Sequence, residues 1–140
     1  MSSLTRFGIS MENQLLSRFD SLIKKLGYTN RSEAFRDLVR NRLVEEEWRQ
    51  DNGDQITVGT ITLIYDHHQR ELSDRLTEHQ HQHHNLVIST MHVHLDHDHC
   101  LEVLVVKGTS HKIQTFAGQL IGLKGVKHGK LVMTSSGRDL

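Results

Sequence analysis

The spacing of apolar residues predicts a short strand followed by a helix at the beginning of the chain. Between residues 5 and 11, apolar and polar side chains alternate with the period of two that is typical of a β-strand. From Glu12 the apolar positions recur at the spacing of one face of an α-helix, and Gly27 is the kind of residue that follows a last helical turn. We therefore predict a strand over residues 5–11 and a helix over residues 12–26.

A second helical pattern follows directly. Asn30, with Glu33 three residues later, has the form of an N-terminal capping box, in which side chains bond the unpaired backbone N–H groups of the first turn. The apolar face continues to about Trp48. Residues 51–55, Asp-Asn-Gly-Asp-Gln, are polar and contain a glycine, which is typical of a linker. The first domain is therefore predicted to span residues 1–50.

The remaining pattern predicts a second domain over residues 56–135. Its order is strand, helix, strand, strand, helix, strand, which is that of a ferredoxin-like split βαβ fold. The strands are expected at residues 56–65, 86–95, 101–106 and 126–133, and the helices at residues 69–81 and 110–123. One face of such a sheet is covered by helices and the other needs a partner. The fold class is accordingly α+β.

The first domain is too small to complete its own structure. A lone strand leaves its backbone N–H and C=O groups unpaired, and two helices cannot cover a core by themselves. Pairing the strand with the same strand of a second chain gives a two-stranded antiparallel ribbon on four helices. This is the ribbon-helix-helix arrangement, in which the ribbon enters the major groove of DNA.

Charge is balanced over the whole chain but not over its beginning. The 140 residues contain 17 Lys and Arg and 17 Asp and Glu, so the net charge predicts no partner. Residues 1–42, by contrast, contain eight basic and four acidic residues, an excess that favours contact with DNA phosphates. Of the basic residues, Arg18, Lys24 and Arg42 are interpreted as solvated positions on helix faces.

Other features of the composition bear on location and assembly. A single cysteine excludes an intrachain disulfide, and neither an apolar run of membrane-spanning length nor a basic and apolar leader is present. We therefore expect a soluble protein of a reducing cytoplasm. The low aromatic content, 5%, gives each domain a thin core and favours oligomerisation.

Residues 79–100 contain eight of the twelve histidines and the only cysteine. Strand-like alternation places His92 and His94 on one face, and a polar turn at residues 96–99 lets the chain return with Cys100 beside them. Two imidazoles and a thiolate suit zinc, copper or nickel, whereas magnesium and calcium prefer oxygen. Candidates for a fourth ligand lie upstream: His79, His81, His83 and His84.

Other interpretations of these residues stay open. A histidine-dense segment can bind metal adventitiously, and a single cysteine is often an inert buried side chain. A zinc hydrolase would use three ligands, a water in the fourth place, and Glu102, Asp96 or Asp98 as base. An antitoxin fits less well, because residues 56–133 are too regularly patterned for a disordered toxin-binding tail, and a metal-storage protein would not need the N-terminal ribbon. The remaining histidines are interpreted as surface groups or secondary sites: His67, His68, His97, His99, His111 and His128.

The chain resembles the nickel-responsive transcriptional regulator family over nearly its whole length. Five segments carry the resemblance, in the same order: R-F-G-I-S, G-Y-T-N-R-S-E-A-F-R-D-L-V-R, H-V-H-x5-C, L-E-V-L-V-V-K-G and G-V-K-H-G-K-L-V-M. It implies a repressor rather than an enzyme, which binds operator DNA when loaded with Ni(II), one ion per subunit, and controls nickel uptake genes. It further implies a homotetramer of two ribbon-helix-helix dimers around four ACT-type domains, with no membrane partner.

The resemblance also implies which residues bind cations. Nickel would lie in a square-planar site between two subunits, its ligands being His92, His94, Cys100 and, from the neighbouring subunit, His81. Cobalt, copper or zinc in another geometry is the alternative. A secondary cation site between the domains would use Glu33 and Asp37, although Glu33 also has the capping role predicted above.

The DNA contacts are implied in the same way. The residues are Arg6, Gly8 and Ser10 on the outward face of the strand, Asn30, Arg31 and Ser32 at the start of the second helix, and Arg70. The strand would read bases, the helix start would anchor a phosphate, and Arg70 would reach the DNA backbone. Gly8 departs from the family pattern, which has a polar side chain there, so the operator sequence cannot be transferred from relatives.

Overall fold

The computed structural model describes residues 3–49, 55–138 and 140, without the side chain of Arg70. The chain divides into two compact units, Met1–Arg42 and Leu43–Leu140. Most of the predicted linker, residues 51–54, lies outside the described residues, and the predicted domain bounds of 1–50 and 56–135 stay predictions.

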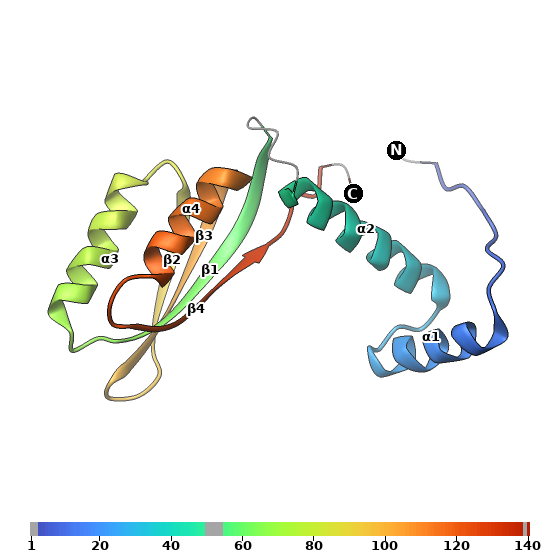
Figure 1. The fold of residues 1–140 in the computed structure, drawn as a ribbon, viewed down its shortest axis with the longest axis horizontal. Helices are drawn as coiled ribbons and strands as arrows, with labels where there is room; N and C mark the ends of the chain where they lie inside the picture. Colours follow the sequence, from blue (N-terminus) through green and yellow to red (C-terminus); the bar gives the residue numbers. More distant parts are fainter. Residues whose placement is uncertain (1–2, 50–54, 139) are drawn as a thin grey trace. The chain divides into compact units, whose positions relative to one another are not determined.

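Two helices make up most of the first unit: α1, Asn13–Lys25, and the greater part of α2, Arg31–Arg49 (Figure 1). Helix α1 ends as its sequence predicts, because Gly27 adopts a positive φ of 88°. The amide of Gly27 then bonds the carbonyl of Lys24 at 3.2 Å, and that of Tyr28 bonds the carbonyl of Ile23 at 3.0 Å. These two bonds form a Schellman motif, which pairs carbonyls that a helix end otherwise leaves unbonded.

The start of α2 confirms half of the predicted capping box. The Asn30 side chain accepts a hydrogen bond from the Glu33 amide at 2.9 Å, as an N-cap residue does. The Glu33 carboxylate pairs instead with Arg36, one turn further along the helix. Glu33 therefore acts as an i,i+3 ion-pair partner rather than as the reciprocal cap.

Residues 3–12 belong to no helix or strand in the single chain, and Figure 1 shows them as an extended trace. Their apolar side chains Leu4, Phe7 and Ile9 are exposed. No strand among the described residues pairs with this segment, and a strand needs a neighbour for its hydrogen bonds. The predicted ribbon requires a second chain, so its pairing stays a prediction.

The second unit confirms the predicted ferredoxin-like order. Its elements are β1 Ile56–Asp66, α3 Arg70–Gln82, β2 Val87–His94, β3 His99–Thr109, α4 Ser110–Ile121 and β4 Val126–Met133. The sheet order is β2-β3-β1-β4, and every neighbouring pair is antiparallel. Strand β3 is longer than predicted at both ends because it pairs with β1 along that strand's full length.

The core of this unit lies between the sheet and its two helices. Alternate residues of β1, including Ile61 and Leu63, pack with Leu76 of α3 and Phe116 of α4. Trp48, in the last turn of α2, is buried against the same core. Its indole nitrogen donates to the carbonyl of Thr134 at 2.8 Å. The end of α2 thus belongs to the second unit.

Candidate metal centre and DNA-contact residues

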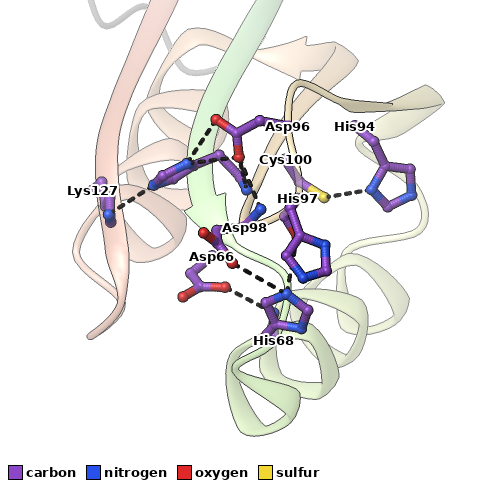
Figure 2. Close-up of polar contacts among 9 residues, drawn as sticks. Asp66, His68, His94, Asp96, His97, Asp98, Cys100 and Lys127 are labelled. Atoms are coloured by element: carbon purple, nitrogen blue, oxygen red, sulfur yellow. Dashed lines mark hydrogen bonds and ion pairs between the residues drawn. The ribbon is translucent and has the colours of Figure 1, made fainter.

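The β2–β3 hairpin brings His94 and Cys100 together. The two residues are direct partners across the strands, so their side chains lie on the same face of the sheet. The distance from His94 Nδ1 to Cys100 Sγ is 3.4 Å, and Cys100 is buried (Figure 2). The polar turn forms as predicted: Asp96 Oδ1 accepts from the amides of Asp98 and His99, both at 2.8 Å. The backbone thus holds an imidazole and a thiol side by side.

His92 faces a buried carboxylate. It pairs with Glu102 across the strands, and its Nε2 lies 3.0 Å from Glu102 Oε1. The same carboxylate accepts from Tyr65 Oη at 3.0 Å and from Gln80 Nε2 at 2.6 Å. A buried carboxylate is stable only when it is paired or hydrogen-bonded in this way. Glu102 therefore orients His92 and connects helix α3 to the hairpin.

The structure adds His67 to the predicted residues. Ligand atoms of His67, His94 and Cys100 all lie within 4.8 Å of one another. The His67 and His94 rings are in an edge-on contact, 5.1 Å between centroids. His67 Nδ1 is buried and has no hydrogen-bond partner among the described residues. From the sequence His67 is interpreted as a surface group or a secondary site, because only the pairing of β1 with β3 brings it to this position.

His81 lies apart from these residues within the chain. It is exposed in the last turn of α3, and the groups of clustered potential ligands found among the described residues include neither His81 nor His92. The four ligands that the resemblance implies are therefore not assembled by one chain. Their joint coordination of nickel stays a prediction.

Burial raises the pKa of the Cys100 thiol, and the negative charges of Glu102, Asp66 and Asp96 raise it further. Burial and the Glu102 carboxylate likewise raise the pKa of Tyr65, which keeps its hydroxyl as a hydrogen-bond donor. These surroundings favour the neutral thiol form of Cys100, which must lose its proton before it can coordinate a metal. Nitrogen and sulfur donors at this spacing fit a borderline transition metal such as nickel, zinc or copper.

The three residues to which the family resemblance assigns base reading are exposed. Arg6, Gly8 and Ser10 all lie in the extended segment ahead of α1. The side chain of Asn30 is used as the cap of α2. Arg70 is the first residue of α3, and its side chain lies outside the part of the chain that the structure describes.

At the start of α2 the guanidinium of Arg31 pairs with the Asp20 carboxylate of α1. Its Nε and Nη2 atoms lie 2.9 and 2.8 Å from the two carboxylate oxygens, and this contact lowers the pKa of Asp20. Ser32 beside it is exposed. At this helix start an anion would therefore be bound by backbone N–H groups and not by the Arg31 side chain.

The two carboxylates of the implied secondary cation site have partners within the first unit. Asp37 accepts from Tyr28 Oη at 2.6 Å and pairs with Arg40 at 3.1 Å, and the Tyr28 hydrogen bond is the main cause of its lowered pKa. Glu33 pairs with Arg36. A cation bound by both carboxylates would have to compete with these contacts.

A two-helix unit behind an extended N-terminal segment, joined to a ferredoxin-like unit in which a histidine and a cysteine lie side by side, is the organisation expected of a ribbon-helix-helix protein with a metal-binding domain. The family model described as "NikR C terminal nickel binding domain" matches residues 58–134, and "Ribbon-helix-helix protein, copG family" matches residues 5–46. The chain belongs to the NikR family of nickel-responsive regulators.

Similar proteins cover the chain from end to end. A putative nickel-responsive regulator of Geobacter sulfurreducens is 59% identical over 140 residues, which are 100% of this chain and 99% of the relative. A protein of the same description from Geobacter metallireducens is 57% identical with the same coverage. One from Caldanaerobacter subterraneus is 51% identical over all of this chain and 90% of the relative. Among the described residues, no helix is long and apolar enough to cross a membrane.

Proposed function

We propose that this chain is a nickel-responsive transcriptional repressor that binds operator DNA as a homotetramer when it is loaded with Ni(II), and that it regulates nickel uptake. The observation that carries the proposal is the 3.4 Å contact between His94 Nδ1 and Cys100 Sγ. It lies in a domain of a nickel-binding family, on a chain whose other domain belongs to a DNA-binding class. The role is regulatory and needs no catalytic group.

The nickel ligands in this proposal are His92, His94 and Cys100 of one chain and His81 of a second. The hairpin register supports the first three, because it holds His92 and His94 on one strand and Cys100 opposite His94. The exposure of His81 at the end of α3 leaves it accessible to another chain. Bound nickel would supply a cross-link between two chains. Glu102 would hold the His92 ring, and Gln80 would couple the position of α3 to the same carboxylate.

DNA binding would use the first unit of two paired chains. Arg6 is able to make a bidentate contact with guanine, Ser10 can make one hydrogen bond, and Gly8 allows close approach without a side-chain contact. The helix start at Asn30, Arg31 and Ser32 would hold a phosphate through backbone N–H groups. Arg70 would add a contact with the DNA backbone, and Glu33 with Asp37 would bind a second cation.

The first test is a titration of the full chain with Ni(II), followed by absorption, beside a Cys100→Ala variant. We expect a thiolate-to-nickel charge-transfer band of a square-planar site that the variant lacks. A weak octahedral spectrum shared by both proteins would contradict the proposed centre.

The second test measures whether nickel binding and DNA binding are coupled. DNA selected from a random pool by the nickel-loaded protein should bind much more weakly when nickel is removed by a chelator. Because coupling is reciprocal, the selected DNA should also tighten nickel binding by the same factor. Equal nickel affinities with and without DNA would contradict the regulatory role. An Arg6→Ala variant serves as the control, since it should lose DNA binding and keep the nickel spectrum.

A further inference from the structure

Gly8 lies in the middle of the extended segment ahead of α1, where the single chain gives no reason for a glycine (Figure 1). Its φ is not positive, so its backbone conformation is open to any residue. A Cβ atom added at Gly8 would meet nothing within 4 Å. A glycine inside a strand weakens the strand, and it often marks a place where another backbone or a ligand approaches closely. Close approach of a partner would therefore explain this glycine.

The predicted ribbon restricts which residue of the second chain lies opposite Gly8. Directly opposite residues in an antiparallel pair point to the same face. Two identical strands must therefore be centred on a residue, because a centre between residues would put the polar Arg6 and the apolar Ile9 on one face. A centre at Gly8 pairs every residue of the predicted strand, with Phe7 opposite Ile9 and Arg6 opposite Ser10. A centre at Arg6 would instead place two like charges opposite each other.

In this register the outward face of the ribbon carries side chains only at its two ends. Each end has Arg6 of one chain beside Ser10 of the other, and two glycines lie opposite each other at the centre. Phe7 and Ile9, which are 77% and 57% exposed in the single chain, occupy the opposite face of the ribbon. The centre therefore offers only backbone to DNA and allows the ribbon to approach the bases closely.

The two Arg6 residues are separated by the length of this central stretch. Successive strand residues rise by about 3.3 Å, so the two arginines lie about 13 Å apart along the ribbon. Base pairs follow one another at about 3.4 Å, so this separation corresponds to about four base pairs. We propose, resting on the DNA-binding function proposed above, that Gly8 pairs with Gly8 of the second chain and leaves a gap in base reading. Arg6 of each chain contacts a guanine, and no side chain reads the base pairs between the two guanines.

The register is tested by cysteine cross-linking of the full chain in a Cys100→Ala background, which removes the single native thiol. Gly8→Cys should form a disulfide between two chains when treated with diamide, because directly opposite residues have the Cβ separation that a disulfide needs. Arg6→Cys alone should not cross-link, whereas Arg6→Cys co-expressed with Ser10→Cys should. Cross-linking of Arg6→Cys with itself, or none of Gly8→Cys, would overturn the register. This measurement needs neither nickel nor DNA.

The gap in reading is tested by selecting DNA from a random pool with the nickel-loaded wild type. The selected sequences should share two guanines, related by two-fold symmetry and about four base pairs apart. Replacing either guanine should weaken binding about 5- to 150-fold, whereas changes of the base pairs between them should have little effect. A strict base preference between the guanines would show that the centre is read and would overturn the gap.

Gly8→Thr fills the centre with a side chain that can hydrogen-bond a base or block close approach. The variant should either select particular bases within the gap or lose the wild-type operator, and it should keep the thiolate-to-nickel band. Gly118→Thr is the matched control, because Gly118 of α4 is exposed and an added Cβ there also meets nothing within 4 Å. It should select the same DNA as wild type.

Two outcomes separate this inference from the proposed function. Unchanged affinity and unchanged base preferences in Gly8→Thr would overturn the gap while the regulatory role stands. A Gly8→Cys cross-link in a protein that selects no DNA, with or without nickel, would contradict the regulatory role and the gap together. The register of the ribbon would then remain as the part that the cross-link supports.

Discussion

The two units of this chain use similar apolar patterns with opposite results. In the second unit the pattern produces a closed core: Phe116 of α4 is 1% exposed and Leu104 of β3 is fully buried. In the first unit Phe7 is 77% exposed, and Leu38 on α2 is 53% exposed. A sheet covered by two helices has two layers to bury apolar groups between, whereas two helices and a lone extended segment do not. A regular apolar pattern therefore identifies a surface that must be buried. One chain can bury that surface only when the same chain also supplies the surface that packs against it.

The largest effect is expected from a substitution on the exposed apolar surface of the first unit, which we predict to contact a second chain. Leu38→Glu places a charge on its exposed apolar surface, which a monomer would tolerate. If that surface is buried between two chains, the uncompensated charge should abolish dimerisation of this unit and with it DNA binding. Light scattering and DNA titration measure both. Asn41→Glu, an exposed substitution on the same helix, should leave both unchanged; a fully assembled Leu38→Glu protein would show that the surface stays open to solvent.

The complementary change tests the second unit. Leu104→Ala removes a fully buried side chain from the core and should lower the free energy of unfolding by about 2–5 kcal/mol. Urea unfolding followed by Trp48 fluorescence measures it, because the single tryptophan is buried in this core. Val132→Ala, at a half-exposed position of β4, should cost less than about 1 kcal/mol. Equal losses in both variants would mean that the two surfaces of the sheet are buried alike.

Two glycines with positive φ allow a finer comparison between the units. Gly27 has a φ of 88° and open space where a Cβ would lie, so Gly27→Ala should cost about 1 kcal/mol from backbone conformation alone. Gly125 has a φ of 103°, and a Cβ there would lie 2.9 Å from Leu72 Cδ2. Gly125→Ala should therefore cost an additional ~1–3 kcal/mol. Thermal unfolding followed by circular dichroism would contradict this if the order were reversed.

The smallest effect concerns pH in the first unit. The Tyr28 hydroxyl lowers the pKa of Asp37, so this contact stabilises the fold above the ordinary carboxyl pKa and is lost as pH falls through the lowered native value. Tyr28→Phe should raise the pKa of Asp37, with Arg40 still holding it below its usual range. NMR titration of the carboxyl carbon measures the shift. The stability curves of variant and wild type should converge in acid, and curves that diverge there would contradict the assignment.

Much of the fold could be predicted because each element carries its own signal. Periodicity predicted all the helices and the four strands of the sheet, and Gly27 and Asn30 predicted a helix end and a helix start that the structure confirms. The side-by-side placement of His94 and Cys100 also followed from strand alternation and a polar turn. These signals lie within a few residues of one another, so no knowledge of the sheet order was needed.

The remaining features depend on contacts between distant segments. His67 reaches His94 only because β1 pairs with β3, and the ring of donors around Glu102 needs α3 packed on the sheet. Glu102 occupies a buried position in an alternating strand, but alternation alone does not identify its partners. The ribbon and the coordination of nickel by His81 depend on a second chain. The sequence of one chain indicates which of its groups are left exposed, but it does not show how two chains pair.

Helix α2 limits how freely the halves of this protein could be exchanged in evolution or in engineering. The compact units meet between Arg42 and Leu43, inside the helix, and Trp48 of its last turn is buried in the core of the sheet domain. If two proteins were fused in the polar segment after this helix, the sheet domain would therefore lose the Trp48 indole and its hydrogen bond to Thr134. A functional junction must keep the last two turns of α2 with the sheet they cover.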